Sequence, residues 1–243
     1  MPAFIEPDWP APANVMALST TRRGGCSAAP FDSFNLGHHV GDEEVAVAVN
    51  RQVLVEALPA GTEVPWLSQV HGIDVIQAGQ GGLYPEADAV FSREGGIACA
   101  VMTADCLPVL LCSTDGAVVA AAHAGWRGLQ AGVLETTVEA MAEPPDRLLA
   151  WLGPAISPAA FEVGAEVLAQ FVAVEFTRNK PAVEACFKPL TGRHGRYLAD
   201  IYALARLRLA RAGVSRVFGG DFCTYSAPQQ FYSYRRDGCT GRM

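Results

Sequence analysis

Residues 106–128 read CLPVLLCSTDGAVVAAAHAGWRG and hold two short apolar runs separated by turn-forming residues. The runs at 106–112 and 117–123 have the length and apolar composition of buried β-strands. A reactive side chain stands at one end of each run, because Cys106 begins the first and His123 closes the second. An unpaired polar side chain is costly in a buried strand, so these two residues are candidates for a functional role.

Further runs along the chain extend this pattern. Short apolar segments predict strands at 15–21, 64–70, 73–77, 87–92, 97–103, 148–152, 214–218 and 231–234. Amphipathic patterns and capping residues predict helices at 43–58, 128–142, 164–175 and 200–212. Strands outnumber helices and mostly follow one another. The expected class is therefore α+β, a single domain over 1–243 with helices outside mixed, largely antiparallel sheets.

Composition narrows the possible functions. The chain has 243 residues, of which 50% are hydrophobic and 18% are charged, and its formal net charge is −7. These values exclude general disorder. The negative net charge also argues against a surface that binds nucleic acid or anionic membranes, because such a surface needs an excess of Lys and Arg. No apolar run reaches the roughly 20 residues that a bilayer span requires. Seven cysteines without a CxxC pair favour free thiols in a reducing cytoplasm.

A third polar residue, His71, closes the run WLSQVHG at 66–72. Two histidines and one cysteine form a natural ligand set for zinc with an open fourth position, so His71, Cys106 and His123 are candidate metal ligands. The same residues suit a Cys–His hydrolase in which Cys106 is the nucleophile and Asp105 orients the base or lies beside the metal. A third interpretation is that the histidines are hydrogen-bonded core residues and the cysteine is a small buried hydrophobe.

Two segments are typical of anion binding. HAGWRG at 123–128 joins a strand to a helix, and its glycines, the helix N-terminus and Arg127 suit a phosphate or carboxylate. FYSYRRDGCTGR at 231–242 brings aromatic residues next to Arg235 and Arg236, which suits a planar anionic ligand. The alternatives are a plain tight turn with a surface arginine in the first segment and a solvated basic end in the second.

The chain resembles the YfiH-like proteins, in which a long set of motifs occurs in the same order. These motifs are TRRGG, FNLGHHVGD, NRQVL, SQVHG, ADAVFS, TADCLPVLL, AAHAGWRGL, WLGPAISPAAFEVG and FYSYRRDGCTGRM. Members of this family have been labelled both laccase-domain polyphenol oxidases and purine nucleoside phosphorylases. The resemblance implies a layered α/β/β/α fold and a metal, generally taken to be zinc, on His71, Cys106 and His123.

The resemblance also implies an activity. It is the zinc-dependent phosphorolysis of adenosine, inosine, guanosine and methylthioadenosine, with adenosine deamination besides, so the expected partners are a small-molecule nucleoside and phosphate. The catalytic candidates are Cys106, Asp105, His71 and His123. The candidates for substrate or phosphate binding are Arg51, Asn35, Arg127, Arg235 and Arg236.

Two alternative functions rest on the same residues. A polyphenol oxidase would use Cu²⁺, but multicopper oxidation needs a blue-copper site plus a cluster held by many histidines, and this chain has five histidines. The oxidase therefore ranks below the phosphorylase. A hydrolase that edits peptidoglycan precursors would use Cys106 as nucleophile or zinc as Lewis acid, and substrate tests separate it from the phosphorylase.

Overall fold

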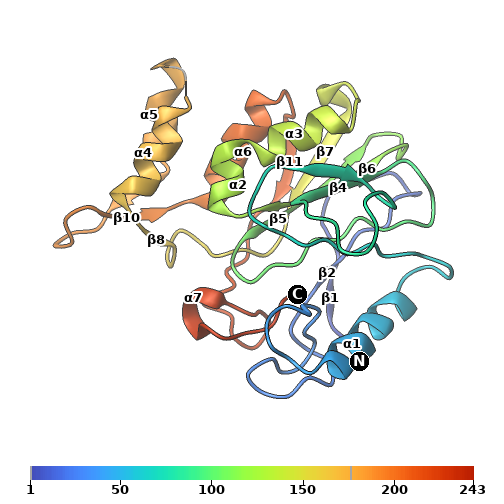
Figure 1. Cartoon of the computed structure of the whole chain (residues 1–243). Helices are drawn as coiled ribbons and strands as arrows, with labels where there is room; N and C mark the ends of the chain where they lie inside the picture. Colours follow the sequence, from blue (N-terminus) through green and yellow to red (C-terminus); the bar gives the residue numbers. More distant parts are fainter. Residues whose placement is uncertain (1, 176) are drawn as a thin grey trace.

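The computed structural model describes residues 2–175 and 177–243. Its centre is a six-stranded sheet with the strand order β11-β7-β5-β6-β4-β3 (Figure 1). These strands are β3 (Val75–Gln77), β4 (Ala89–Ser92), β5 (Leu107–Ser113), β6 (Val119–Ala124), β7 (Leu148–Leu152) and β11 (Arg216–Gly219). The inner pairs are antiparallel, whereas β11–β7 and β3–β4 are parallel. The expected class, with helices outside mixed and largely antiparallel sheets, is confirmed.

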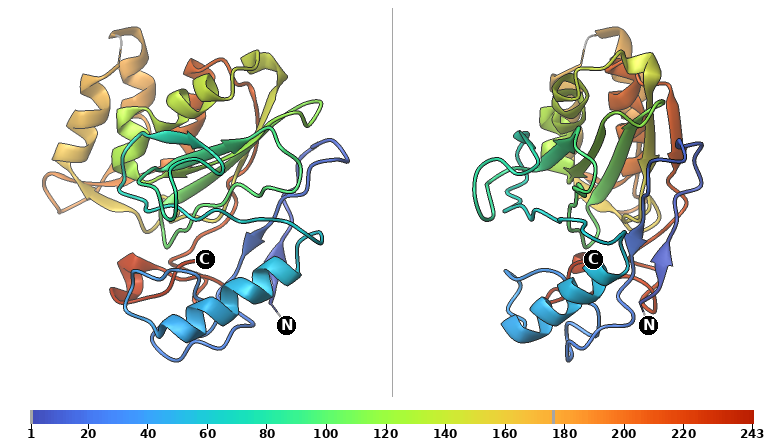
Figure 2. Two further views of the ribbon diagram at one scale, coloured as in Figure 1. Left: turned by 45° about the vertical axis from the view of Figure 1, so that its right-hand side comes forward. Right: turned by 90° about the vertical axis from the view of Figure 1, so that its right-hand side faces the viewer.

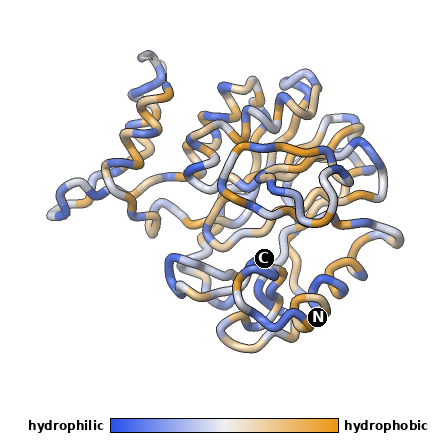
Figure 3. Tube along the Cα trace, in the orientation of Figure 1, coloured by the Kyte–Doolittle hydropathy of each residue, from blue (hydrophilic) through white to orange (hydrophobic). Residues whose placement is uncertain are grey.

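One face of this sheet is covered by helices (Figure 2). They are α2 (Trp126–Ala131), α3 (Val133–Ala140) and α6 (Ile201–Arg211). Leu129, Val133 and Leu209 from these helices join Val109 and Leu152 of the sheet in the main hydrophobic core. Hydrophobic and hydrophilic residues are interleaved along these helices, as expected when one side of a helix packs on a sheet and the other faces water (Figure 3).

The opposite side of the sheet carries a smaller layer. It contains β1 (Phe4–Ile5), β2 (Ser19–Thr20) and α1 (Glu44–Glu56). The buried residues of α1 are Val47, Asn50 and Leu54, which follow the three- and four-residue spacing of one helix face. Asn50 is fully buried, and its amide donates to Ser27 Oγ and to the Asn35 carbonyl, so α1 also anchors the loop that precedes it.

A third, three-stranded sheet lies at one end of the molecule beside two helices (Figure 1). Its strands are β8 (Glu162–Gly164), β10 (Arg196–Ala199) and β9 (Phe187–Pro189), in that order, and the helices are α4 (Ala165–Ala173) and α5 (Lys180–Glu184). The remaining elements are the 3-10 turns η1 (Pro145–Arg147) and η2 (Thr177–Asn179) and the short helix α7 (Tyr234–Asp237). Among the described residues, no helix combines the length and the apolar character needed to cross a membrane.

Several predicted elements differ from the structure. The strands expected at 64–70 and 97–103 are absent, and only single bridges form there, between Glu63 and Ile97 and between Ser68 and Glu86. The segment expected as a strand at 231–234 runs instead into α7.

The predicted helices agree more closely with the structure than the predicted strands do. The helix expected at 128–142 is divided into α2 and α3 at Gly132, whose φ of 113° lies in the left-handed region. The cap of the helix expected at 200–212 is confirmed, because the Asp200 side chain accepts a hydrogen bond from the Ala203 amide.

Candidate metal centre

His71, Cys106 and His123 converge on one point. Their ligand atoms all lie within 4.8 Å of one another, and Cys106 Sγ is 3.8 Å from His71 Nε2. Tetrahedral zinc with bonds of about 2.0–2.3 Å separates its ligand atoms by about 3.3–3.8 Å, so a small inward movement suffices to bind an ion. The chemistry of the donor set, one thiolate and two imidazoles, also fits zinc.

Sheet register explains why two of these residues meet. β5 and β6 pair in antiparallel register, with Leu107 opposite Ala124 and Pro108 opposite His123. Cys106, directly before β5, therefore lies next to the last residues of β6. His71 reaches the same point from an irregular turn, where its φ of 62° is unusual for a residue with a side chain.

Gly125 leaves the space that this convergence needs. It directly follows β6 and begins α2, and a Cβ atom there would lie 2.9 Å from His71 Cδ2 and 3.0 Å from Cys106 Sγ. Contacts this short force neighbouring atoms to move. Gly125 is thus needed for the close approach of the backbone to His71 and Cys106, whereas the sequence predicted a glycine-assisted approach to a bound anion.

Asp88 contacts two of the candidate ligands and was not among the residues that the sequence singled out. It is fully buried, and its Oδ1 lies 2.7 Å from His123 Nδ1. Three successive amides, those of Val70, His71 and Gly72, donate to the same carboxylate at 3.1, 2.9 and 2.6 Å. Metal-binding histidines commonly donate their second ring N–H to a carboxylate, and this geometry is the signal that only the folded chain reveals.

The electrostatics of the centre favour a thiolate. Burial raises the pKa of the Cys106 thiol, but His123 and His71 outweigh this effect and lower the pKa to about 6. Burial lowers the pKa of His123, but Cys106 and Asp88 outweigh it and raise that pKa. Since metals bind the deprotonated sulfur, Cys106 is poised as a ligand near neutral pH.

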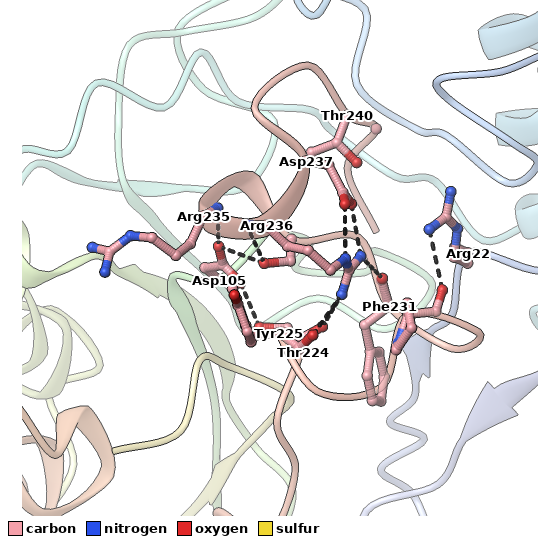
Figure 4. A network of polar contacts seen from close by, with 12 residues as sticks. Arg22, Asp105, Thr224, Tyr225, Phe231, Arg235, Arg236, Asp237 and Thr240 are labelled. Carbon is pink, nitrogen blue, oxygen red and sulfur yellow. Dashed lines mark hydrogen bonds and ion pairs between the residues drawn. The ribbon is translucent and has the colours of Figure 1, made fainter. Parts of the chain in front are cut away.

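Asp105 does not take the role expected of it. Its carboxylate turns to the C-terminal segment, accepting from Thr224 Oγ1 at 2.6 Å, Ser233 Oγ at 3.0 Å and the Arg235 amide at 2.7 Å (Figure 4). These contacts do not support the prediction that Asp105 orients a histidine base, although the residue does directly precede the candidate ligand Cys106. The residue ties the start of β5 to the end of the chain, and its φ of 90° places Cys106 in the turn beside it.

Two of the predicted phosphate or substrate residues are structural. All five N–H groups of the Arg236 guanidinium are used within the chain, by the carbonyls of Thr224, Tyr225 and Phe231 and by both carboxylate oxygens of Asp237 (Figure 4). No donor remains for a phosphate. The contacts of Arg236 therefore give no support to its predicted role in phosphate binding.

The amide of Asn35 is saturated in the same way. Its Nδ2 donates to the Gly37 carbonyl and to Asp42 Oδ2, and its Oδ1 accepts from the Gly37 and Arg242 amides. Asn35 is fully buried, so it holds the loop at 35–42 against the C-terminus. These contacts give no support to its predicted role in substrate binding.

Arg127 and Arg235 lie at the surface. Arg127 is in the first turn of α2, two residues beyond Gly125, and its guanidinium lies 4.5 Å from the centroid of the Trp126 ring. Arg235 donates to the Glu162 carbonyl at 2.8 Å and lies over the Phe161 ring. Both arginines are exposed, so their side chains are accessible from solvent.

Arg51 lies between the aromatic side chains of Trp66 and Tyr84. Its guanidinium lies 4.0 Å from the Trp66 ring centroid and donates to Tyr84 Oη at 2.8 Å and to the Leu36 carbonyl at 2.9 Å. The same group lies 3.3 Å from His38 Nδ1. Burial lowers the pKa of Arg51, as expected for a cation held partly out of water.

A histidine pair lies beside Arg51. His38 packs against Tyr84 at a ring distance of 4.4 Å and against His39 at 5.5 Å. Burial lowers the pKa of His39, and the charges of Arg242 and His123 lower it further. His39 therefore stands within electrostatic reach of both the metal centre and Arg242.

Cavity size does not identify this site. A cavity of about 560 Å³ lies elsewhere, between the N-terminal segment and the large sheet, and Trp66, Leu110 and Trp151 are among its lining residues. None of the three metal-ligand candidates lines it. The chemistry of the side chains, rather than the volume of a pocket, defines the site.

The fold and the centre define a mixed α/β protein with a His–Cys–His group suited to one metal ion. The chain belongs to the family described as multi-copper polyphenol oxidoreductase laccase, which matches residues 16–243.

Curated relatives carry a different enzyme name. A purine nucleoside phosphorylase of Pseudomonas aeruginosa is 54% identical over 243 residues, which cover 100% of this chain and 97% of the relative. The purine nucleoside phosphorylase YfiH of Escherichia coli is 52% identical over 245 residues, with 100% and 97% covered. These names support an enzyme that acts on small molecules.

Solved structures agree with the fold. A Neisseria meningitidis protein superposes with a TM-score of 0.93 at 50% identity, covering 99% of this chain and 96% of its own. YlmD from Geobacillus stearothermophilus gives a TM-score of 0.85 at 32% identity, covering 95% and 90%.

Proposed function

We propose that this protein is a zinc-dependent purine nucleoside phosphorylase that accepts adenosine, inosine, guanosine and methylthioadenosine and also deaminates adenosine. The observation that carries the proposal is the convergence of His71, Cys106 and His123 beside Gly125. The enzyme names of relatives more than 50% identical over the whole chain support the reaction. The free thiols of the described chain are consistent with a cytoplasmic location.

The donor set favours zinc over copper. Of the five histidines, His71 and His123 belong to the candidate centre, while His38 and His39 form a separate ring pair. The described residues contain no other group of three potential ligands, whereas multicopper oxidation needs several copper sites. A bound zinc ion would supply a Lewis acid at an open coordination position.

The phosphate is assigned to the neighbourhood of Arg51. Arg51 is half-buried, lies against the Trp66 ring and has His38 beside it, whereas Arg127 and Arg235 are exposed and the donors of Arg236 are used within the chain. A guanidinium in such surroundings is less screened by water and attracts a phosphate more strongly. Arg127 and Arg235, which remain exposed, would contribute at the mouth of the site.

Nucleoside turnover tests this proposal. Purified protein of measured metal content is incubated with each of the four nucleosides, with and without phosphate, and the free base and the matching sugar 1-phosphate are quantified. Phosphate-dependent release of both products, lost on metal chelation and restored by zinc, is the expected result. Deaminase activity predicts conversion of adenosine to inosine in the absence of phosphate. No turnover by zinc-loaded protein, or restoration by copper alone with oxidation of a phenol, would contradict the proposal.

A further inference from the structure

Asp88 contacts two of the three residues of the proposed metal centre. The residue lies directly before β4 and is 0% exposed. Its Oδ1 accepts from the His71 amide at 2.9 Å and faces His123 Nδ1 at 2.7 Å. Its Oδ2 accepts from the Val70 amide at 3.1 Å and the Gly72 amide at 2.6 Å.

These four contacts use the full acceptor capacity of a carboxylate. An ionised aspartate offers about four lone-pair positions and no donor. An asparagine of the same shape offers one acceptor oxygen and two N–H donors, and those donors would face other N–H groups here. The arrangement is therefore specific to a carboxylate, and it also fixes the proton of His123 on Nδ1. The other ring nitrogen, Nε2, is then the one that gives up its proton and binds when a metal enters.

The backbone holds Asp88 in this position independently of any metal. The Asp88 carbonyl accepts from the His123 amide at 2.7 Å, and the next residue pairs with Ala122 in the β4–β6 register. On the other side, the three donating amides belong to successive residues of the turn that carries His71. Successive N–H groups that point at one anion form a compact anion-binding turn. This contact accounts for the positive φ of His71, which the turn requires.

We propose that Asp88 is a positioning residue that assembles the site before a metal arrives, holding the turn at 70–72 and the tautomer of His123 with one carboxylate. The proposal rests on the metal centre of the proposed function, but not on its reaction. It implies that the metal-free protein already keeps both histidines in place, and that metal affinity depends on a group that never touches the metal.

Hydrogen exchange of the metal-free wild-type protein is the first test. The amides of Val70, His71 and Gly72 lie in a turn outside regular secondary structure, where amides ordinarily exchange fast. Because they donate to a buried carboxylate, we expect all three to be protected without metal. Fast exchange of these amides in metal-free wild-type protein, with protection only after zinc is added, would overturn the proposal.

The variant Asp88→Asn is the second test, measured as zinc affinity by competition with a chromophoric chelator. Loss of an outer partner of a metal ligand commonly lowers affinity about 10–100-fold, and we expect a loss in this range with the turn amides unprotected. The control is Asp74→Asn, which changes an exposed carboxylate three residues beyond His71 and should leave affinity unchanged. Equal zinc affinity of Asp88→Asn and wild type would refute the positioning role.

Two readouts keep this proposal separate from the proposed function and from simple misfolding. The wild-type exchange experiment needs no variant, so it decides the matter even when Asp88→Asn does not fold. In the folded, zinc-loaded variant, the nitrogen chemical shifts of His123 should show the loss of the single Nδ1–H tautomer that zinc-loaded wild type has. Failure of zinc-loaded wild type to cleave nucleosides would reject the phosphorylase while leaving these binding measurements intact.

Discussion

The backbone at Gly125 lies so close to Cys106 that a Cβ atom there would come within 3.0 Å of the sulfur. The same atom would lie 2.9 Å from the His71 ring. Two ligands from distant parts of the chain thus meet at a position where only glycine fits. The metal centre depends on this absence of a side chain as much as on the ligands themselves.

Gly125→Ala is therefore expected to weaken metal binding. Forcing an extra carbon into a packed site costs about 1–3 kcal/mol, which corresponds to roughly ten- to a hundred-fold in zinc affinity. Chelator competition measures the effect. Gly95→Ala is a matched control, because a Cβ at Gly95 meets nothing within 4 Å. Similar zinc affinities for the two variants would show that the site adapts to a side chain at 125.

Arg51→Ala is expected to raise the KM for phosphate while metal content stays constant. A charge-assisted contact to phosphate contributes about 1.5–3 kcal/mol, so the change should be roughly ten- to a hundred-fold. Arg51→Lys keeps the charge but loses the planar stacking on Trp66, and it should fall in between. Initial rates at varied phosphate provide the measurement. A larger effect from Arg127→Ala than from Arg51→Ala would move the anion site to the start of α2.

Arg236→Ala should reduce stability and leave the phosphate KM unchanged. The substitution removes the donors that satisfy the carbonyls of Thr224, Tyr225 and Phe231. Unsatisfied groups of this kind cost about 1–3 kcal/mol, which a urea denaturation curve detects. A wild-type free energy of unfolding together with a raised KM would restore Arg236 as a phosphate ligand.

Much of the large sheet was predictable from sequence because its strands are nearly continuous apolar runs. β5, β6 and β7 are such runs, and all three form where the sequence placed them. The segment at 97–103 has the same apolar character but forms no ladder. The side chain of Gln69 makes the hydrogen bonds that a neighbouring strand would otherwise make. It donates to the Met102 carbonyl and accepts from the Met102 backbone N–H. A side chain that replaces a backbone partner leaves no periodic signal in the sequence.

The candidate site was predictable in its ligands but not in its supports. His71, Cys106 and His123 stood out because polar residues at the ends of apolar runs are rare. Asp88 also stands at the start of an apolar run, but an aspartate there is equally typical of a turn. Its partners lie 16–18 residues away along the chain at 70–72 and 35 residues away at His123, so only the fold brings them together. Arg236 was predicted to bind phosphate because it lies in a basic segment of the sequence. The sequence cannot show that the N–H donors of this guanidinium are used by carbonyls and a carboxylate of the same chain.

The most direct test compares the wild-type protein with Cys106→Ser for zinc content and for phosphate-dependent conversion of inosine to hypoxanthine and ribose 1-phosphate. Serine keeps the shape of the side chain but is a poor zinc ligand, so the account predicts about one zinc ion per wild-type chain and little in the variant. Turnover should be almost completely lost, while the variant melts close to the temperature of metal-free wild type. Wild-type turnover by a zinc-free Cys106→Ser protein would contradict it.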